Sequence, residues 1–205
     1  MVTAFQYADF TARADLAASV HRDRAAQFVA RHGWPLVLTG EGREVDSFDA
    51  PGTEYLVAAR AGRHLASLRL RRASAGSMAQ AAFPDVWRRH GGGLSQMSEV
   101  TRLCSAPGLG ALDCRAAIAE LLIALCRHGR QSGQERLFGV VYPGVARGIA
   151  RSGWHSERLD SFETDGRETW LCRWDCTAAA DWALQESAAR LAERAAMARP
   201  DRRAA

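Results

Sequence analysis

Lysine is missing from this 205-residue sequence, so all 27 of its basic residues are arginine. The chain also lacks any uninterrupted apolar run close to the eighteen or so residues of a membrane-spanning helix. The N-terminal stretch MVTAFQYADFTARADL has no basic-then-apolar signal pattern, and the five cysteines form no short disulfide framework. We therefore expect a cytoplasmic protein with reduced thiols that is not secreted and has no membrane partner.

The overall composition is that of a folded globular protein with a mild positive charge. Apolar residues make up 47% of the chain and charged residues 24%, while the formal net charge is +4 and the pI about 9.1. The positive excess fits either an ordinary solvated surface or an anionic partner, such as nucleic acid, an acidic protein or a phosphorylated cofactor. Because the arginines are spread through the chain and interleaved with acids, we expect no nucleic-acid partner.

The apolar spacing predicts one domain over residues 1–205, with residues 178–205 as a C-terminal helical extension. Strands and helices mix without strict alternation, which favours an α/β or α+β fold of three layers, α/β/α. Helices are expected at 11–32, 77–87, 114–128, 145–151 and 178–197, with a mobile HGGG connector at 90–93. Strands are expected at 55–61, 65–71, 96–104, 136–142, 155–162 and 169–175.

An acidic loop follows the first predicted helix. Glu44, Asp46 and Asp49 lie within six residues, a density that is usually that of a solvated loop. The cluster becomes informative where arginines from elsewhere converge on it. Paired ions would then form a polar network that holds a cleft open and presents charge to a zwitterionic substrate. The candidate partners on predicted regular elements are Arg24, Arg69 and Arg102.

Glu99 and Arg102 lie three residues apart on a predicted strand. On a regular strand such residues point to opposite faces, so the two side chains would not meet. A β-bulge between them would change this, and bulges are common beside active sites. The alternative is an exposed edge strand that carries ordinary charges.

These polar and aromatic positions recur in an order that resembles a known family. The stretch HGWPLVLTGEGREVDSFDAPGTEYLVA, the strand SEVTRLCSAPG with its E-x-[ST]-R pattern and the later segment GVARGIARSGW are similar to the acyl-homoserine-lactone synthases, the LuxI-type autoinducer synthases. The resemblance covers roughly residues 20–160. The positions that carry it are Arg24, Phe28, Trp34, Glu44, Asp46, Asp49, Arg69, Phe83, Glu99 and Arg102.

The resemblance implies a fold similar to that of the GNAT superfamily of N-acyltransferases, with a twisted mixed sheet, a V-shaped cleft and flanking helices. It also implies an acyltransferase that makes quorum-sensing signals. The amine of S-adenosylmethionine would attack an acyl thioester, and the carboxylate of the same substrate would then displace methylthioadenosine to close a lactone ring. Both reactants are substrates, so the resemblance implies no cofactor and no metal site.

The same resemblance assigns roles to polar residues. Glu99 would take the amine proton, with Arg102 orienting that carboxylate or supporting the sheet, and Asp46 would receive the substrate ammonium. Taken without the resemblance, Arg24, Phe28 and Trp34 are better explained by ordinary core packing with one surface arginine. The implied S-adenosylmethionine site comprises Arg24, Phe28, Trp34, Asp46, Asp49 and Arg69.

The acyl chain would lie against the sheet and the apolar helix at 114–128, among residues that core packing explains equally well. Gly139 stands where relatives that make 3-oxo products carry a threonine, and this favours an unsubstituted acyl group. Departures from the family pattern at 71–74, where a proline and a threonine are usual, and at Ser98 and Leu103 favour an unusual acyl group, branched or aromatic. The implied lining is Phe83, Leu103, Leu122, Leu125, Phe138, Gly139, Val140 and Tyr142.

The acyl donor stays open between two anionic carriers. Arg147, Arg151 and Arg158 match a basic surface that some relatives offer to acyl carrier protein, whereas other relatives take acyl-CoA. A different function on the same fold is a GNAT-like N-acyltransferase that acts on another amine. Binding of S-adenosylmethionine would separate the two functions.

Overall fold

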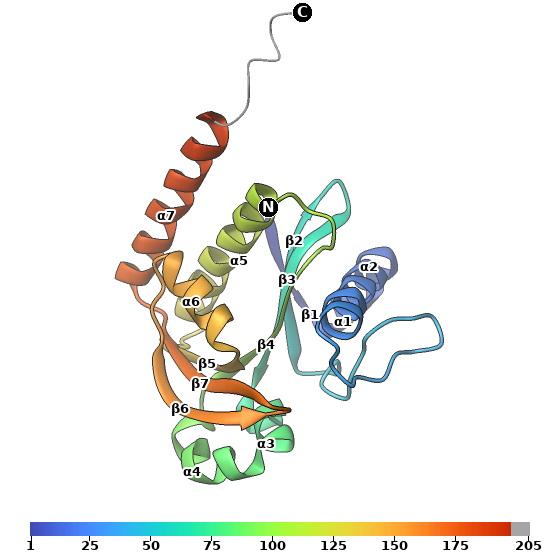
Figure 1. Ribbon diagram of the computed structural model, residues 1–205, viewed down its shortest axis with the longest axis vertical. Helices are drawn as coiled ribbons and strands as arrows, with labels where there is room; N and C mark the ends of the chain where they lie inside the picture. Colours follow the sequence, from blue (N-terminus) through green and yellow to red (C-terminus); the bar gives the residue numbers. More distant parts are fainter. Residues whose placement is uncertain (198–205) are drawn as a thin grey trace, which may run out of the picture.

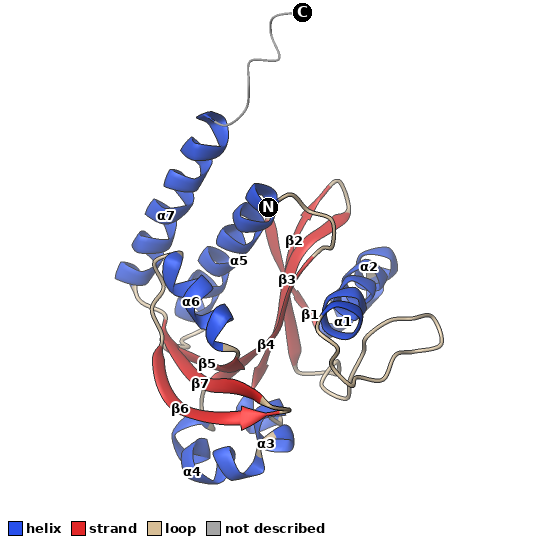
Figure 2. Ribbon diagram, in the orientation of Figure 1, coloured by secondary structure: helices blue, strands red, loops and turns tan. Residues whose placement is uncertain are grey.

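The computed structural model describes residues 1–197, in which strands and helices mix along the chain (Figures 1 and 2). The strands are β1 (Val2–Gln6), β2 (Thr53–Arg60), β3 (Arg63–Arg72), β4 (Ser98–Ser105), β5 (Arg136–Val141), β6 (Glu157–Thr164) and β7 (Arg167–Asp175). The helices are α1 (Tyr7–Ala12), α2 (Ala14–Arg24), α3 (Met78–Ala82), α4 (Pro84–Leu94), α5 (Ala111–Gln131), α6 (Pro143–Arg151) and α7 (Ala178–Met197), with a π-helix η1 (Ala25–Arg31) and a 3₁₀ turn η2 (Ala73–Ala75).

The strands form one mixed sheet in the order β1-β2-β3-β4-β5-β7-β6. Neighbouring strands run antiparallel except β4 and β5, which run parallel. The parallel ladder is short, because Ser98 pairs with Leu137 and Glu99 with Phe138, and the pairing then ends. The two halves of the sheet therefore separate beyond Glu99, which gives the predicted V-shaped cleft.

Helices cover both faces of the sheet, which confirms the predicted α/β architecture. On the half formed by β1 to β4, α1 and α2 lie on one face and α5 on the other (Figure 1). On the half formed by β5, β7 and β6, α6 lies on the α5 side and α3 and α4 lie on the opposite side. The largest core lies between α5 and the sheet. It follows from a helical stripe at Leu121, Leu122 and Leu125 that meets the alternating Leu68 and Leu70 of β3.

Three details of the predicted secondary structure are wrong. The helix expected over 11–32 is divided into α1, α2 and η1, and an unpredicted strand, β1, precedes it. The HGGG segment is not a connector but part of α4, where a Cβ on Gly91 would lie 2.6 Å from the Trp87 ring. Gly129 does not end the long helix; it lies inside α5, where a Cβ would lie 2.6 Å from Sγ of Cys176. In both places glycine allows a close approach rather than a turn.

The C-terminal helix α7 occupies 178–197 as predicted and packs on α5. Residues 198–205 of the expected extension lie outside the described residues. Within residues 1–197, every helix is too short or too polar to cross a membrane.

Candidate active site

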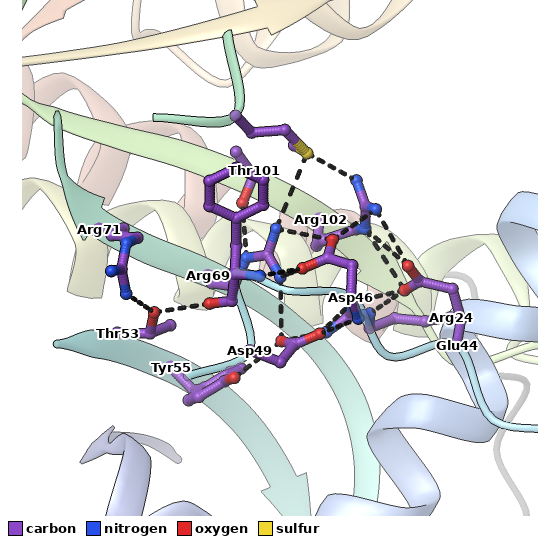
Figure 3. A network of polar contacts seen from close by, with 12 residues as sticks. Arg24, Glu44, Asp46, Asp49, Thr53, Tyr55, Arg69, Arg71, Thr101 and Arg102 are labelled. Atoms are coloured by element: carbon purple, nitrogen blue, oxygen red, sulfur yellow. Dashed lines mark hydrogen bonds and ion pairs between the residues drawn. The ribbon is translucent and has the colours of Figure 1, made fainter. Parts of the chain in front are cut away.

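An ion cluster ties the loop between η1 and β2 to α2 and the sheet (Figure 3). Arg24 of α2 places its Nε 2.5 Å from Oε2 of Glu44, and its two Nη atoms each lie 2.9 Å from an oxygen of Asp49. The Arg24 side chain is only 1% exposed. Bidentate, charge-assisted hydrogen bonds of this kind hold a guanidinium in one orientation. Arg24 therefore fixes both ends of the acidic segment to α2.

Two further arginines reach the same carboxylates from the sheet. Arg69 of β3 donates to the Asp46 carboxylate at 2.6 and 3.0 Å, and its Nη1 lies 3.0 Å from Oδ1 of Asp49. Arg102 of β4 donates to Glu44 at 3.0 Å and to Asp46 at 2.7 Å. The predicted convergence of three arginines on the acidic loop is thus confirmed.

A β-bulge on β4 directs Arg102 toward the cluster. Ser67 of β3 pairs with Cys104, whereas Arg69 pairs with Thr101, so two residues of β4 lie opposite one residue of β3. Within this irregularity Arg102 has a φ of 56°, in the left-handed region that non-glycine residues seldom adopt. The bulge turns Arg102 to the side of Thr101, whose hydroxyl accepts a hydrogen bond from Arg69 at 3.0 Å. A bulge is therefore present, but it lies at Arg102 rather than between Glu99 and Arg102, and it does not bring these two side chains into contact.

The charges of the cluster favour the ionised forms of Asp46 and Asp49. Burial by itself raises the pKa of Asp49, but Arg24 and Arg69 outweigh it and hold that pKa well below its usual range. Against the same effect of burial, Arg69 and Arg102 lower the pKa of Asp46. The pKa of Arg24 is raised because Asp49 outweighs burial. Three guanidinium groups and three carboxylates compensate one another, which is what makes buried charges tolerable.

Glu99 lies beside the cluster, with its carboxylate at the start of α3. Its Oε2 accepts a hydrogen bond from the N–H of Met78 at 2.7 Å, and its Oε1 accepts one from Ala79 at 2.8 Å. Glu99 is 2% exposed, and burial raises its pKa although these two amides oppose the rise. Arg102 contacts Glu44 and not Glu99, so of its two expected roles the contacts favour support of the loop and sheet. The amides of α3, rather than Arg102, orient the Glu99 carboxylate.

A cavity of about 490 Å³ occupies the gap between β4 and β5. Its walls come from both sides of the sheet, with η1 and α3 on one side and α5, α6 and β7 on the other. Glu99 and Arg102 line it, so a charged region and an apolar region share one space. Of the residues predicted to meet substrates, the lining contains Phe28, Trp34, Phe83, Glu99, Arg102, Leu103, Leu122, Leu125, Gly139, Val140 and Tyr142.

Four predicted binding residues belong to the ion cluster and not to the cavity wall. Arg24, Asp46, Asp49 and Arg69 are absent from the lining and lie behind Arg102. Their hydrogen bonds go to one another and to neighbouring groups of the protein such as Glu44, Thr101 and Arg102. Their place in the structure therefore differs from the expected substrate wall: they hold the position of the one cluster arginine that faces the cavity.

Phe138 is misplaced by the sequence prediction. It is fully buried on the face of β5 that α3 and α4 cover, with its ring centroid 6.4 Å from that of Trp87. Side chains alternate along a strand, so Phe138 lies on the opposite face from Gly139, and it does not border the cavity as Gly139 and the later Val140 do. The assignment of Phe138 to the acyl lining is therefore wrong.

Aromatic side chains form one wall of the cavity. Phe28 and Trp34 are stacked, with ring centroids 4.8 Å apart and an interplanar angle of 8°, and Tyr142 meets Trp34 edge-on at 6.0 Å. The Arg102 guanidinium carbon lies 5.7 Å from the Phe28 ring centroid, a cation–π distance. The wall thus combines flat apolar faces with a fixed positive charge.

Sequence reasoning missed many lining residues, among them Met78, Trp154 and Trp174. Met78 joins the two charged regions, because its Sδ lies 3.3 Å from Nη1 of Arg102 while its N–H binds Glu99. The Ser-x-x-Gln pattern starting at Ser77, whose side chain caps α3, was the available signal for this helix start. Trp154 and Trp174 also line the cavity. Trp154 ends the segment GVARGIARSGW that carries the resemblance, but nothing in that segment shows that its side chain reaches the cavity, because tertiary packing brings both tryptophans there.

Two of the three predicted carrier-binding arginines lie together on the surface. The guanidinium carbons of Arg147 and Arg158 lie 5.7 and 4.8 Å from the ring centroid of Trp170. Arg151 is exposed one helical turn beyond Arg147 on α6. The structure therefore places an exposed basic group on α6 and β6.

A family model described as autoinducer synthase matches residues 9–181 of the chain. No curated protein sequence gives a significant match.

Among solved structures, the AHL synthase LasI is 23% identical, with a TM-score of 0.76 and coverage of 91% of this chain and 94% of LasI. The CoA-dependent acyl-homoserine lactone synthase BjaI, solved with SAM and isopentyl-CoA, is 20% identical, with a TM-score of 0.76 and coverage of 94% and 89%. An acyl-CoA N-acyltransferase from Pseudomonas aeruginosa is 20% identical, with a TM-score of 0.58 and coverage of 84% and 97%. These likenesses concern the fold.

Proposed function

The chain belongs to the autoinducer synthase family and is an acyltransferase, and on that premise we propose that it is an acyl-homoserine-lactone synthase. Its substrates are S-adenosylmethionine and an acyl thioester, and its products are an acyl-homoserine lactone, methylthioadenosine and the free thiol. The observation that carries the proposal is a single cavity that combines three features. These are the buried Glu99 carboxylate, an aromatic wall with the Arg102 guanidinium, and an apolar region around Leu122, Leu125 and Gly139, called the acyl arm.

S-adenosylmethionine is proposed to lie against Phe28, Trp34 and Arg102. The stacked rings offer a flat face to adenine or the sulfonium, and the guanidinium matches the substrate carboxylate. Arg24, Asp49 and Arg69 contribute by holding Arg102 and Asp46 in place. Asp46 stands behind Arg102, but its side chain is 21% exposed, so it remains the candidate acceptor for the ammonium. That BjaI has been solved with SAM and isopentyl-CoA is consistent with such a site.

Glu99 is the proposed proton acceptor. An α-amine has a pKa near 7.7–8.0, so only roughly a tenth to a fifth of it is neutral at pH 7. A buried carboxylate whose pKa is raised is a better base than an exposed one, and the α3 amides fix its direction. Glu99 takes the proton as the amine nitrogen attacks the thioester carbonyl carbon, and the carbon–sulfur bond then breaks to release the thiol.

Lactone closure needs little from the protein beyond position. The substrate carboxylate oxygen attacks its own γ-carbon, and the bond from that carbon to the sulfonium breaks, so methylthioadenosine leaves with the electron pair. Holding the carboxylate oxygen in line with the bond from the γ-carbon to sulfur accelerates this step through orientation. Arg102 is the residue proposed to position that carboxylate.

The gap between β4 and β5 suits an acyl thioester. Beyond Glu99 and Phe138 the facing backbone edges no longer pair with each other, which leaves amide groups to stabilise the oxyanion. At Gly139 a Cβ would lie 2.8 Å from the carbonyl oxygen of Val100, so a hydroxyl-bearing side chain has no room there. This supports an unsubstituted acyl group.

The proposed carrier surface is the group formed by Arg147, Arg151 and Arg158. Both acyl carrier protein and coenzyme A present phosphate to such a surface, and exposed guanidinium groups bind phosphate well.

The test is to incubate the purified chain with S-adenosylmethionine and hexanoyl thioesters, one carried by coenzyme A and one by acyl carrier protein. Mass spectrometry should find hexanoyl-homoserine lactone and methylthioadenosine in equal amounts with at least one donor. Calorimetry should show binding of S-adenosylmethionine to the free protein. Acylation of a different amine without methylthioadenosine would instead establish a general N-acyltransferase.

A further inference from the structure

We propose that Trp154 and Trp174 close the acyl arm of the cavity and restrict the enzyme to short or compact acyl groups. The inference rests on the proposed function and adds to it a class of acyl substrate and the residues that select it. The two side chains are specificity-determining, because they meet the far end of the acyl group and not the reacting atoms.

Strand register places Trp174 across the sheet from the reacting groups. Trp174 of β7 pairs with Leu137 of β5, which pairs with Ser98 of β4, so these three side chains share one face. Glu99 is the next residue along β4 and points to the other face. An acyl chain whose carbonyl lies near Glu99 must pass between β4 and β5 and then meets Trp174.

Trp154 is held rigidly. Its indole N–H donates to the backbone oxygen of Asp175 at 2.9 Å. The preceding Gly153 has a φ of 91°, and a Cβ there would lie 2.9 Å from the backbone oxygen of Ala183, so α7 packs directly behind this turn. Trp154 is therefore a fixed part of the end wall.

Trp174 fills the space between Trp154 and Gly139. Its ring centroid lies 6.4 Å from that of Trp154 at an interplanar angle of 57°, and its Cζ3 lies 3.8 Å from the position of a Cβ on Gly139. Its indole nitrogen is buried and has no hydrogen-bond partner among the residues that the structure describes. Trp174 is thus held by packing alone, and shortening it enlarges the arm without breaking a hydrogen bond.

The volume of the cavity points in the same direction. Sites for one small ligand commonly measure about 300–1,000 Å³. Here about 490 Å³ must hold S-adenosylmethionine and the acyl group together. Short straight groups and compact branched groups fit such a space, whereas a long straight chain needs the volume that the two indole rings occupy.

The experiment is a competition among butyryl, isovaleryl, hexanoyl and dodecanoyl thioesters, with the lactone products measured by mass spectrometry. All four groups are presented on coenzyme A and, separately, on acyl carrier protein. The natural sequence should favour the first three groups over dodecanoyl. Trp174→Leu should raise the ratio of dodecanoyl to hexanoyl product by about tenfold or more, since each methylene in an apolar pocket changes selectivity by that order.

Two variants complete the comparison. Trp174→Phe keeps an aromatic ring of smaller size and should shift the product ratio in the same direction by a smaller factor. If Trp174→Leu does not fold, this variant alone decides the matter. Trp182→Ala removes a tryptophan that is 63% exposed on α7 and should leave the ratio unchanged.

The outcomes separate the two proposals. Absence of lactone from every donor would refute the synthase function itself. Lactone formation with an unchanged product ratio in the Trp174 variants would overturn the role of the tryptophans and leave the function standing. A natural enzyme that prefers dodecanoyl would overturn the proposed size limit.

Discussion

The two sides of the cavity are built on opposite principles. On the η1 side, three arginines and three carboxylates leave no charge without a partner, and almost all of these contacts are buried. On the α5 side, the walls are leucine, isoleucine and tryptophan side chains. Loss of one member of the ionic set leaves its partners as buried, uncompensated charges, whereas loss of an apolar side chain costs in proportion to the volume removed. The ionic side is therefore all-or-none, and the apolar side can be tuned.

The largest effect is expected where the two sides meet. Glu99→Gln should lower turnover by about 10²- to 10⁴-fold, because the amide cannot accept the amine proton. The glutamine oxygen can still accept one α3 amide, so the fold should survive, which circular dichroism would verify. Turnover at the normal rate in the folded variant would remove Glu99 from its role as base.

Removing an arginine of the ion cluster should lower the stability of the folded protein. Arg24→Ala leaves the buried Glu44 and Asp49 short of a partner and should lower the free energy of unfolding by about 3–5 kcal/mol. Urea denaturation measures this. The control is Arg88→Ala, which breaks an ion pair with Asp85 whose side chains are 76% and 75% exposed and should cost about 0–1 kcal/mol. Equal losses in the two variants would contradict the all-or-none behaviour of the cluster.

Acid should act on the same side of the molecule in two steps. Burial and the nearby Arg24 lower the pKa of His21 to about 4, so the folded chain keeps it neutral while the unfolded chain protonates it below about 6.5. Stability should thus fall between pH 6.5 and 4. The depressed pKa values of Asp46 and Asp49 add stability above the ordinary aspartate pKa of about 3.9, which is lost as the pH falls further.

The measurement for this prediction is the urea midpoint as a function of pH. His21→Leu should flatten the first step and keep the second. If the His21→Leu variant still loses stability between pH 6.5 and 4 as the natural sequence does, another group is responsible for that step.

The smallest effect is expected on the tunable side. Gly139→Ala places a methyl group 2.8 Å from the Val100 carbonyl oxygen and should cost about 1–3 kcal/mol of stability as the strands shift apart. Gly144→Ala is the matched control, since a Cβ there meets nothing within 4 Å. Thermal unfolding of the two variants measures the difference, and equal melting temperatures would show that the gap between the strands yields freely.

Much of the fold follows from local patterns, and the exceptions have physical causes. Alternation along β3 and the apolar stripe of α5 were sufficient to predict both elements. The strand β1 was not predicted, because it lies at the edge of the sheet, where most of its side chains are exposed and the alternation of apolar residues is weak. The glycines of α4 were taken for a connector because the packing of Trp87 on Gly91 is a tertiary contact that no local rule contains.

The candidate site was predicted less evenly. The ten positions of the family pattern anticipated the ion cluster and Glu99, yet they did not separate residues that face the cavity from those that stand behind it. Phe138 illustrates the limit, because a shift of one residue along β5 changes the face of the sheet. Trp154 and Trp174 illustrate a second limit. Trp154 ends the segment GVARGIARSGW that carries the resemblance, and Trp174 lies outside it, yet the two rings come together only in the folded chain.

The burial of the ion cluster also separates two responses to ionic strength. Screening by dissolved ions acts on charges in contact with water and hardly reaches those enclosed by protein. The contacts of Arg24, Arg69 and Asp49 are enclosed, whereas Arg147 and Arg158 are bathed in solvent. Concentrated salt should therefore leave the ion cluster intact and weaken only the binding of an anionic acyl carrier to Arg147 and Arg158.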